Sequence, residues 1–184
     1  MRMTDQKQLA RFGLFDARVP RYTSYPTAPH FHEDIDCGKY AQWLQAITGK
    51  ERISLYIHVP YCDRLCWFCA CHTKHTLKYE PIAIYLESLK KEIATVGALV
   101  SRDAAVTAVH FGGGSPTMLR PDDMIDLMAS LRAAFRFADD VEISVEMDPN
   151  DLDEPRYDAL AAIGMTRASL GVQDFNPLVQ KTIN

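Results

Sequence analysis

Four of the five cysteines lie in one short segment, at Cys62, Cys66, Cys69 and Cys71, and Cys37 lies apart. In a reducing compartment, such a group of thiols is more typical of a metal or iron–sulfur centre than of disulfide bonds. The first three follow the spacing C-x3-C-x2-C. A [4Fe–4S] cube normally takes four thiolates, so three thiolates from one loop would leave one iron open to a substrate or cofactor. The segment therefore predicts a metal centre that can transfer an electron to a bound molecule.

A structural zinc site is the alternative for the same segment. Its fourth ligand, beside the three spaced cysteines, would be Cys71, His72 or His75. Zinc sites usually set two close pairs of ligands apart by a longer spacer, whereas here bulky Trp67 and Phe68 stand between two of the thiols. Aromatic side chains beside an iron–sulfur cluster would screen its sulfurs from water and tune its redox potential. The spacing favours the cluster and leaves zinc open.

Alternating strands and helices must position this segment. The apolar pattern predicts four strands and three amphipathic helices, with a fourth helix opening at Asn176. The cysteines directly follow the first strand, at the sheet edge where α/β folds carry their chemistry. Successive β–α units imply parallel strands with right-handed crossovers, in an open sheet or, as we favour, an arc of an α/β barrel. The strands are expected at residues 53–59, 105–111, 141–146 and 166–172, and the helices at 79–100, 121–135 and 155–163.

The predicted elements divide the chain into two parts. Residues 1–50 read as an extended N-terminal arm with a short helix at 37–47, and residues 51–184 as about four β/α units. A closed barrel of this kind takes roughly 250 residues, so we expect the C-terminal half of the barrel to be absent. The last strand would then have an unpaired edge, and we expect the isolated chain to be marginally stable and to bind a cluster poorly.

Composition limits the partners. The chain has 184 residues, of which 47% are hydrophobic and 24% charged, as in a globular domain with one apolar core. Its net charge of -4 gives no overall attraction to nucleic acid or to anionic lipid. No apolar run approaches the roughly 18 residues that span a bilayer, and no secretory signal opens the chain. We therefore expect a cytoplasmic protein without nucleic-acid or membrane partners.

The cysteine motif, with an aromatic residue before its third cysteine, resembles the radical S-adenosylmethionine (SAM) superfamily. Further segments are similar to the oxygen-independent coproporphyrinogen III oxidases of haem biosynthesis, and together they cover essentially the whole chain in order. This resemblance implies an α/β fold, the N-terminal part of a (β/α)6-type partial barrel with parallel strands preceded by an extended arm. The segments are RYTSYPTA at 21–28, YIHVPYC at 56–62, CAC at 69–71, GGGSPT at 112–117, EMDP at 146–149 and GVQDFN at 171–176.

The resemblance implies a chemistry. Cys62, Cys66 and Cys69 would ligate a [4Fe–4S] cluster, and the amino and carboxylate groups of SAM would chelate the fourth iron. Reduction would split SAM into methionine and a 5′-deoxyadenosyl radical, because the cofactor carries the difficult step and the protein aims it. The radical would take a hydrogen atom from a propionate of coproporphyrinogen III. Loss of CO2 and of one further electron would leave a vinyl group, and two rounds would give protoporphyrinogen IX.

The resemblance also assigns residues to the cofactor. Tyr56 would hydrogen-bond near SAM, Phe68 would contact it through its backbone, and Gly113 would let the chain approach the methionine moiety. Glu146 would accept from the ribose hydroxyls. Gln173, Gly114 and Ser115 would reach a second SAM molecule, Ser115 standing where the family usually has threonine.

Cys71 is not expected to be a ligand. The resemblance makes Cys71 and Tyr56 the expected catalytic residues, since the C-x-C ending separates the oxidases from related haem-chaperone-like proteins. Such a cluster- and SAM-binding haem carrier, and a radical SAM methyltransferase on the same scaffold, are the alternative functions. A reductase or a flavodoxin- or ferredoxin-type electron donor and a monomeric state are also expected. The roles of Cys37, His72 and His75 stay open.

Overall fold

The computed structural model describes residues 7–8, 10–13, 26–69 and 71–183. The chain forms two compact units, Met1–Gly38 and Lys39–Asn184. In the first unit the described elements are a 3-10 helix, η1 (Ala28–His30), and the start of α2 (Cys37–Gln45), which continues into the second unit. Most of the RYTSYPTA segment, residues 21–25, lies outside the described residues.

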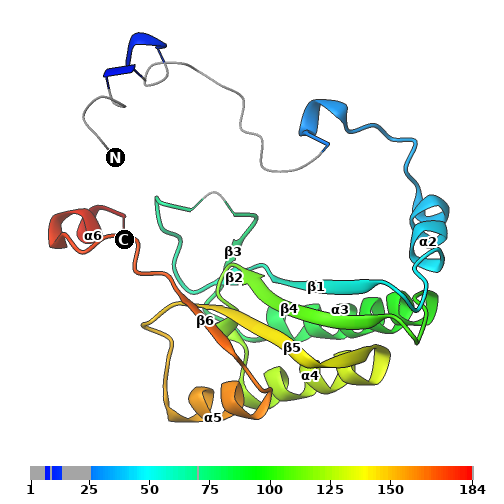
Figure 1. The fold of residues 1–184 in the computed structure, drawn as a ribbon. Helices are drawn as coiled ribbons and strands as arrows, with labels where there is room; N and C mark the ends of the chain where they lie inside the picture. Colours follow the sequence, from blue (N-terminus) through cyan, green and yellow to red (C-terminus); the bar gives the residue numbers. More distant parts are fainter. Residues whose placement is uncertain (1–6, 9, 14–25, 70, 184) are drawn as a thin grey trace. The chain divides into compact units, whose positions relative to one another are not determined.

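A parallel four-stranded sheet forms the centre of the second unit (Figure 1). Its strands occur in the order β1 (Arg52–Val59), β4 (Ala105–Gly113), β5 (Arg136–Met147) and β6 (Arg167–Leu170). The four predicted strands are thus confirmed. β5 begins earlier than expected because Arg136 and Phe137 pair with the start of β4, before an irregularity in the register. The acidic pair Asp139–Asp140 interrupts the apolar pattern, so the sequence does not show this early start.

Three helices pack on one face of this sheet: α3 (Glu80–Leu99), α4 (Pro121–Ala134) and α5 (Glu154–Ala162) (Figure 1). Alternation along the strands explains the arrangement, since successive side chains point to opposite faces. In β5, Ile143, Val145 and Met147 are buried, while Glu146 between them stays partly exposed. Helices cover only one face among the described residues, as in an arc of a barrel, and leave the other face free for polar side chains.

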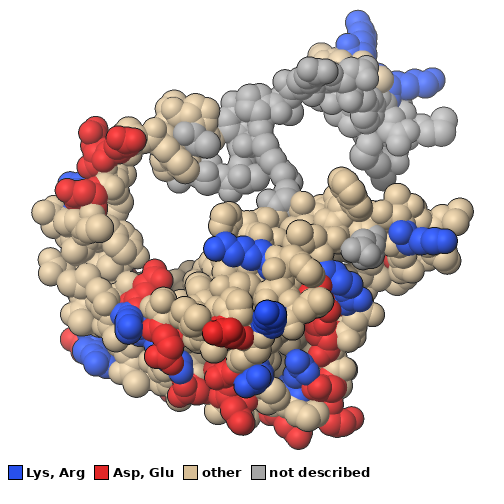
Figure 2. Space-filling view, turned by 180° about the vertical axis from the view of Figure 1, so that it is seen from behind, with Lys and Arg blue, Asp and Glu red and all other residues tan. Residues whose placement is uncertain are grey.

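Short elements complete the second unit. β2 (Tyr61–Cys62) pairs in parallel with β3 (Lys74–His75), apart from the main sheet. A 3-10 helix, η2 (Pro116–Met118), follows the glycine run that ends β4, and α6 (Pro177–Ile183) follows β6, as the predicted fourth helix. On the face shown in Figure 2, acidic and basic side chains are interspersed over the described surface. Among the described residues, the search for a helix with the length and apolar character of a membrane span finds none.

Leu127 lies at the centre of the helix–sheet core and is fully buried. We expect Leu127→Ala to lower the free energy of unfolding by about 3 kcal/mol, because a buried leucine loses both its burial energy and the contacts that a cavity removes. Urea denaturation followed by circular dichroism measures the change. Ile125 on the same helix is 41% exposed, and Ile125→Ala is the matched control with a much smaller effect. Equal losses in the two variants would contradict this packing.

Tyr79, the residue before α3, joins that helix to the start of α4. Its hydroxyl donates to Asp123 and accepts from the backbone N–H of Arg120 at 3.1 Å. The Arg120 guanidinium lies 4.0 Å from the centre of the tyrosine ring. Burial raises the pKa of Tyr79 to about 12, and the hydrogen bond to Asp123 adds to the shift while Arg120 opposes it. The hydroxyl therefore keeps its proton at neutral pH, and with it the hydrogen bond to Asp123.

We expect Tyr79→Phe to cost about 1 kcal/mol of stability near pH 7, the usual net value of a hydrogen bond. The unfolded pKa of tyrosine is about 10, so the contribution from the raised folded pKa is complete below pH 10 and disappears as the pH rises towards 12. Urea unfolding at several pH values measures both effects. Tyr157→Phe, at an exposed tyrosine, is the control. The wild type is expected to lose stability above pH 10, and Tyr79→Phe is expected to lack this loss. The same loss in Tyr79→Phe would refute the assignment.

Candidate functional site

The cysteine loop leaves the carboxyl edge of the sheet and is closed at its base. β1 ends at Val59, Pro60 follows, and the next two residues form β2. The return strand donates from Lys74 N to the Pro60 carbonyl at 2.8 Å, and Thr76 N donates to the Cys62 carbonyl at 3.0 Å. These bonds fix both ends of the loop, so Cys62 starts from a rigid position.

The thiols of Cys62, Cys66 and Cys69 lie close enough to influence one another. Burial, followed by the neighbouring Cys69 and Cys66 and then Asp63, raises the pKa of Cys62 to about 11. Cys69 N also donates to the Cys66 carbonyl at 3.2 Å, which turns the loop back on itself. A cationic cluster would reverse this repulsion, because metal ions stabilise thiolates. The donor set therefore fits a cluster held by three thiolates of one loop.

Cys71 is exposed and lies beside the Cys69 thiol. Its backbone N–H donates to Cys69 Sγ at 3.3 Å. Burial raises the pKa of Cys71, and Cys69 and the carboxylate of Glu146 add to the shift. The structure thus brings Cys71 next to one of the predicted ligands, Cys69.

Two consecutive glycines let the loop after β4 cross the loop after β1. Gly113 has φ +114°, and a Cβ there would lie 2.7 Å from ring atoms of His58. A Cβ on Gly114 would lie 2.4 Å from the Tyr61 carbonyl oxygen. Gly114 N donates to Val59 O and Ser115 N to Tyr61 O, both at 2.8 Å. The protein's own backbone therefore requires both glycines, in addition to any role in approaching a cofactor.

Tyr56 and His58 connect the open face of the sheet to the cysteine loop. His58 Nε2 lies 3.0 Å from the His72 carbonyl oxygen. A carbonyl only accepts, so Nε2 carries the proton and Nδ1 accepts from the Tyr56 hydroxyl at 3.1 Å. Burial, followed by the Glu146 carboxylate, raises the pKa of Tyr56, which keeps this hydroxyl protonated. His58 is thus a hydrogen-bonded link in the described structure, with both ring nitrogens occupied.

Glu146 is held from two sides on the same face. Its Oε2 accepts from Gly113 N at 3.2 Å, and its Oε1 lies 3.2 Å from His110 Nε2. The other nitrogen of His110, Nδ1, lies 3.0 Å from Ser144 Oγ. The carboxylate still has lone pairs to offer a ligand, since its side chain is 43% exposed.

Ser115 is less accessible than expected for a cofactor contact. The residue is 6% exposed, and its hydroxyl donates to Asp151 at 2.8 Å and lies 2.8 Å from Thr117 Oγ1. Burial raises the pKa of Asp151, against the lowering effect of the Ser115 hydrogen bond. The Ser115 hydroxyl thus ties η2 to the loop after β5. Asp151 also gathers with Asp63 and Asp148, whose carboxylate oxygens lie within 4.8 Å of one another.

Phe68 and Gln173 are both exposed. Phe68 is 62% exposed beside Trp67, whose backbone N–H donates to the Ile183 carbonyl of α6 at 2.9 Å. Gln173 has φ +65°, the one positive value among described residues other than glycine. Such a conformation costs energy and is frequent at functional sites. Contacts of Phe68 and Gln173 with a cofactor stay predictions.

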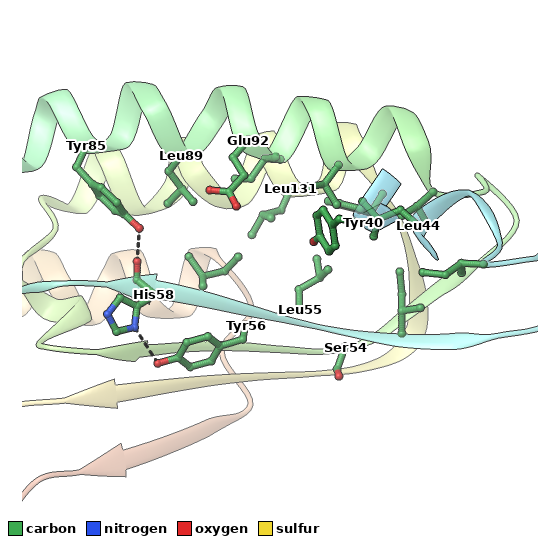
Figure 3. A pocket seen from close by; sticks show the side chains of 17 residues that line it. Tyr40, Leu44, Ser54, Leu55, Tyr56, His58, Tyr85, Leu89, Glu92 and Leu131 are labelled. Carbon is green, nitrogen blue, oxygen red and sulfur yellow. Dashed lines mark hydrogen bonds between the residues drawn. The ribbon is translucent and has the colours of Figure 1, made fainter. Parts of the chain in front are cut away.

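A cavity of about 450 Å³ lies between α2, β1 and α3 (Figure 3). Tyr40, Leu55 and Leu89 are among its lining residues, and Glu92 reaches it from α3. Tyr85, which also lines it, donates to the His58 carbonyl. Figure 3 shows the side chains of Tyr56 and His58 on the opposite side of β1 from the helix α3. Tyr56 and His58 also line the cavity from β1, but their side chains project to the other side of that strand, where the predicted cofactor residues lie.

Sequence reasoning missed His110, Ser144 and Asp151. A signal for the first two was present, because His110 and Ser144 alternate with apolar residues on their strands and must point to the same face as Tyr56 and Glu146, although Ser144 is itself buried. Asp151 has no comparable signal, since its bond to Ser115 joins two loops that are far apart in the sequence.

Comparison with known proteins gives consistent matches. The family model for the radical SAM superfamily matches residues 56–184. An "Oxygen-independent coproporphyrinogen III oxidase" of Paracoccus denitrificans is 50% identical over 182 residues, which are 98% of this chain and 40% of that protein. A protein of the same name from Salmonella typhimurium is 42% identical over 178 residues, 96% of this chain and 38% of its own length.

A solved structure is similar over nearly the whole chain. It is described as "Coproporphyrinogen III oxidase (HemN) from Escherichia coli is a Radical SAM enzyme", with a TM-score of 0.83 and 39% sequence identity. The match covers 94% of this chain and 38% of the Escherichia coli chain. The chain thus spans about 40% of the length of the relatives that it matches.

Proposed function

Because this chain belongs to the radical SAM superfamily, whose members use a [4Fe–4S] cluster and SAM, we propose that it forms the cofactor-binding part of an oxygen-independent coproporphyrinogen III oxidase. The enzyme converts two propionates of coproporphyrinogen III to vinyl groups and gives protoporphyrinogen IX. The similarity to relatives that carry this name supports coproporphyrinogen III as the substrate. We also propose that residues 51–184 form the core and that an N-terminal arm precedes this core in the sequence. The enzyme is proposed to work in the cytoplasm as a monomer.

One observation carries the proposal: a loop whose base is closed by backbone hydrogen bonds brings the thiols of Cys66 and Cys69 near enough to Cys62 to raise its pKa. We assign Cys62, Cys66 and Cys69 as cluster ligands. When bound, the cluster and SAM together supply an electron and a carbon-centred radical that can take a hydrogen atom from a propionate.

The residues of this chain bind and orient the cofactor. Glu146, held by the Gly113 N–H, accepts from the ribose hydroxyls of SAM. Tyr56 presents a protonated hydroxyl on the same sheet face, and Phe68, which is exposed on the cysteine loop, is proposed to contact SAM through its backbone. Cys71, whose backbone N–H donates to Cys69 Sγ, is proposed to hold or pass on a proton beside the cluster.

The second SAM molecule is the finer part of the proposal. Gly114, Ser115 and Gln173 are its proposed contacts. Because the Ser115 hydroxyl is buried on Asp151, we assign Ser115 to shaping the loop beside this molecule, and Gln173, which is exposed, to direct contact. A reductase or a flavodoxin- or ferredoxin-type protein supplies the electrons.

The test is product analysis with the full-length protein that contains this chain, purified and reconstituted without oxygen. We expect about four iron and four sulfide per chain, and 5′-deoxyadenosine together with protoporphyrinogen IX when SAM, a reductant and coproporphyrinogen III are present. Zinc in place of iron would contradict the cluster assignment. Methylated products would indicate the methyltransferase instead, and stable haem binding without product would indicate the carrier.

A further inference from the structure

His110 lies on the open sheet face, between the two residues that we assign to SAM. We propose that His110 is a positioning residue for SAM, which holds the carboxylate of Glu146 and the ring of Tyr56 in their binding orientation. This inference rests on the proposed function, because it concerns how that cofactor is bound.

The first contact fixes the carboxylate. A carboxylate at neutral pH only accepts hydrogen bonds, so His110 Nε2 donates to Glu146 Oε1 across 3.2 Å. The Gly113 N–H donates to the other oxygen at 3.2 Å. With one donor at each oxygen, the carboxyl group can neither rotate about its terminal bond nor swing away from β4. Removing His110 leaves a single donor and frees this rotation.

The second contact fixes the histidine itself. With Nε2 protonated in the neutral ring, Nδ1 accepts from the Ser144 hydroxyl at 3.0 Å. The sheet register places Tyr56 beside His110 on one side and Ser144 on the other. The imidazole therefore has a defined tautomer and rotamer, set by the two neighbouring strands.

The third contact joins the two binding residues. The rings of His110 and Tyr56 are stacked, with centroids 5.7 Å apart and planes 17° from parallel. The side chains of His110 and Glu146 are 37% and 43% exposed, so the group stays open to a ligand. A hydrogen-bonding histidine that orients a partly exposed carboxylate is what a preorganised hydroxyl-binding site requires.

Two substitutions in the reconstituted full-length protein test the inference. His110→Leu removes both hydrogen bonds, and we expect it to weaken SAM binding about tenfold, as for the loss of a hydrogen bond to a charged group. His110→Gln can place an amide N–H near the position of Nε2, and we expect it to restore binding to within about threefold of the wild type. Anaerobic equilibrium dialysis with labelled SAM measures the dissociation constant, and iron content is measured on the same samples.

A double-mutant cycle separates positioning from general damage to the fold. In a Glu146→Gln background, His110→Leu is expected to change the dissociation constant by less than about twofold, since the carboxylate that it orients is already gone. Glu142→Gln is the matched control. Glu142 is on the same strand and pairs with Arg167 at 3.4 Å, and its replacement should leave SAM binding unchanged.

The outcomes are distinct. Wild-type affinity in His110→Leu, or a full tenfold effect that persists beside Glu146→Gln, would overturn the inference alone. Loss of iron from His110→Leu would overturn it in favour of a structural role. Failure of the wild-type protein, with its cluster complete, to bind SAM would overturn the proposed function and the inference together.

Discussion

Cys66→Ser is expected to abolish 5′-deoxyadenosine formation by the reconstituted full-length protein. The substitution removes one of the three thiolates that a single loop supplies, and iron–sulfur clusters are held by thiolates rather than hydroxyls. The loss should exceed the roughly 100-fold cost that is typical even of outer-shell partners of a metal site. Iron and sulfide content and chromatography of the nucleoside product measure the two effects.

Cys37→Ser is the matched control, because it makes the same change at an exposed cysteine outside the loop. It should keep the iron content and the activity of the wild type. Cys71→Ser separates ligation from catalysis, since we expect it to keep the cluster and to lose product formation. Normal 5′-deoxyadenosine formation by Cys66→Ser would contradict the assignment of this loop as a cluster site.

Gly114→Ala is expected to destabilise the fold by about 3 kcal/mol or more and to lower the iron content. The added Cβ would lie 2.4 Å from the carbonyl oxygen and 2.8 Å from the carbonyl carbon of Tyr61, which are backbone atoms that cannot move aside. Overpacking against side chains typically costs about 1–3 kcal/mol, and a clash with backbone costs more because backbone atoms can move less to relieve it. Tyr61 directly precedes Cys62, so the displacement reaches the first ligand. Urea unfolding and iron analysis measure the two consequences.

Gly171→Ala serves as the control for this prediction. The added Cβ there would meet only the end of the Gln173 side chain, at 3.1 Å, and a carbonyl oxygen at an ordinary 3.7 Å. A flexible side chain can move, so the cost should be a small fraction of that at Gly114. If the two variants lose the same stability, the close crossing of the two loops is wrong.

The sheet and helices could be predicted because apolar periodicity records which side chains are buried. In α4, Met124, Leu127, Met128 and Leu131 are buried at helical spacing, and this pattern is visible in the sequence. The early start of β5 could not be predicted, because backbone pairing at Arg136 and Phe137 leaves no apolar alternation behind it.

The candidate site could be predicted in part. Residue spacing indicated a loop of three cysteines, and the resemblance assigned these as ligands and Tyr56 and Glu146 as cofactor contacts, all of which stay predictions. The environment of Ser115 and the demand for glycine at Gly114 depend on contacts between loops far apart in the chain, with Asp151 and with Tyr61. Such contacts follow from the register of the sheet and the crossing of its loops, which residue spacing does not encode.

The hydrogen bond from His58 to the His72 carbonyl has a consequence for how the cysteine loop can evolve. Surface loops usually tolerate insertions and deletions well. Here the stretch from His72 to His75 is held at both ends. The His72 carbonyl accepts from the His58 imidazole, and His75 pairs with Cys62 in the two-stranded sheet. An extra residue within this stretch would break one of the two attachments, so changes in loop length are confined to other parts of the chain.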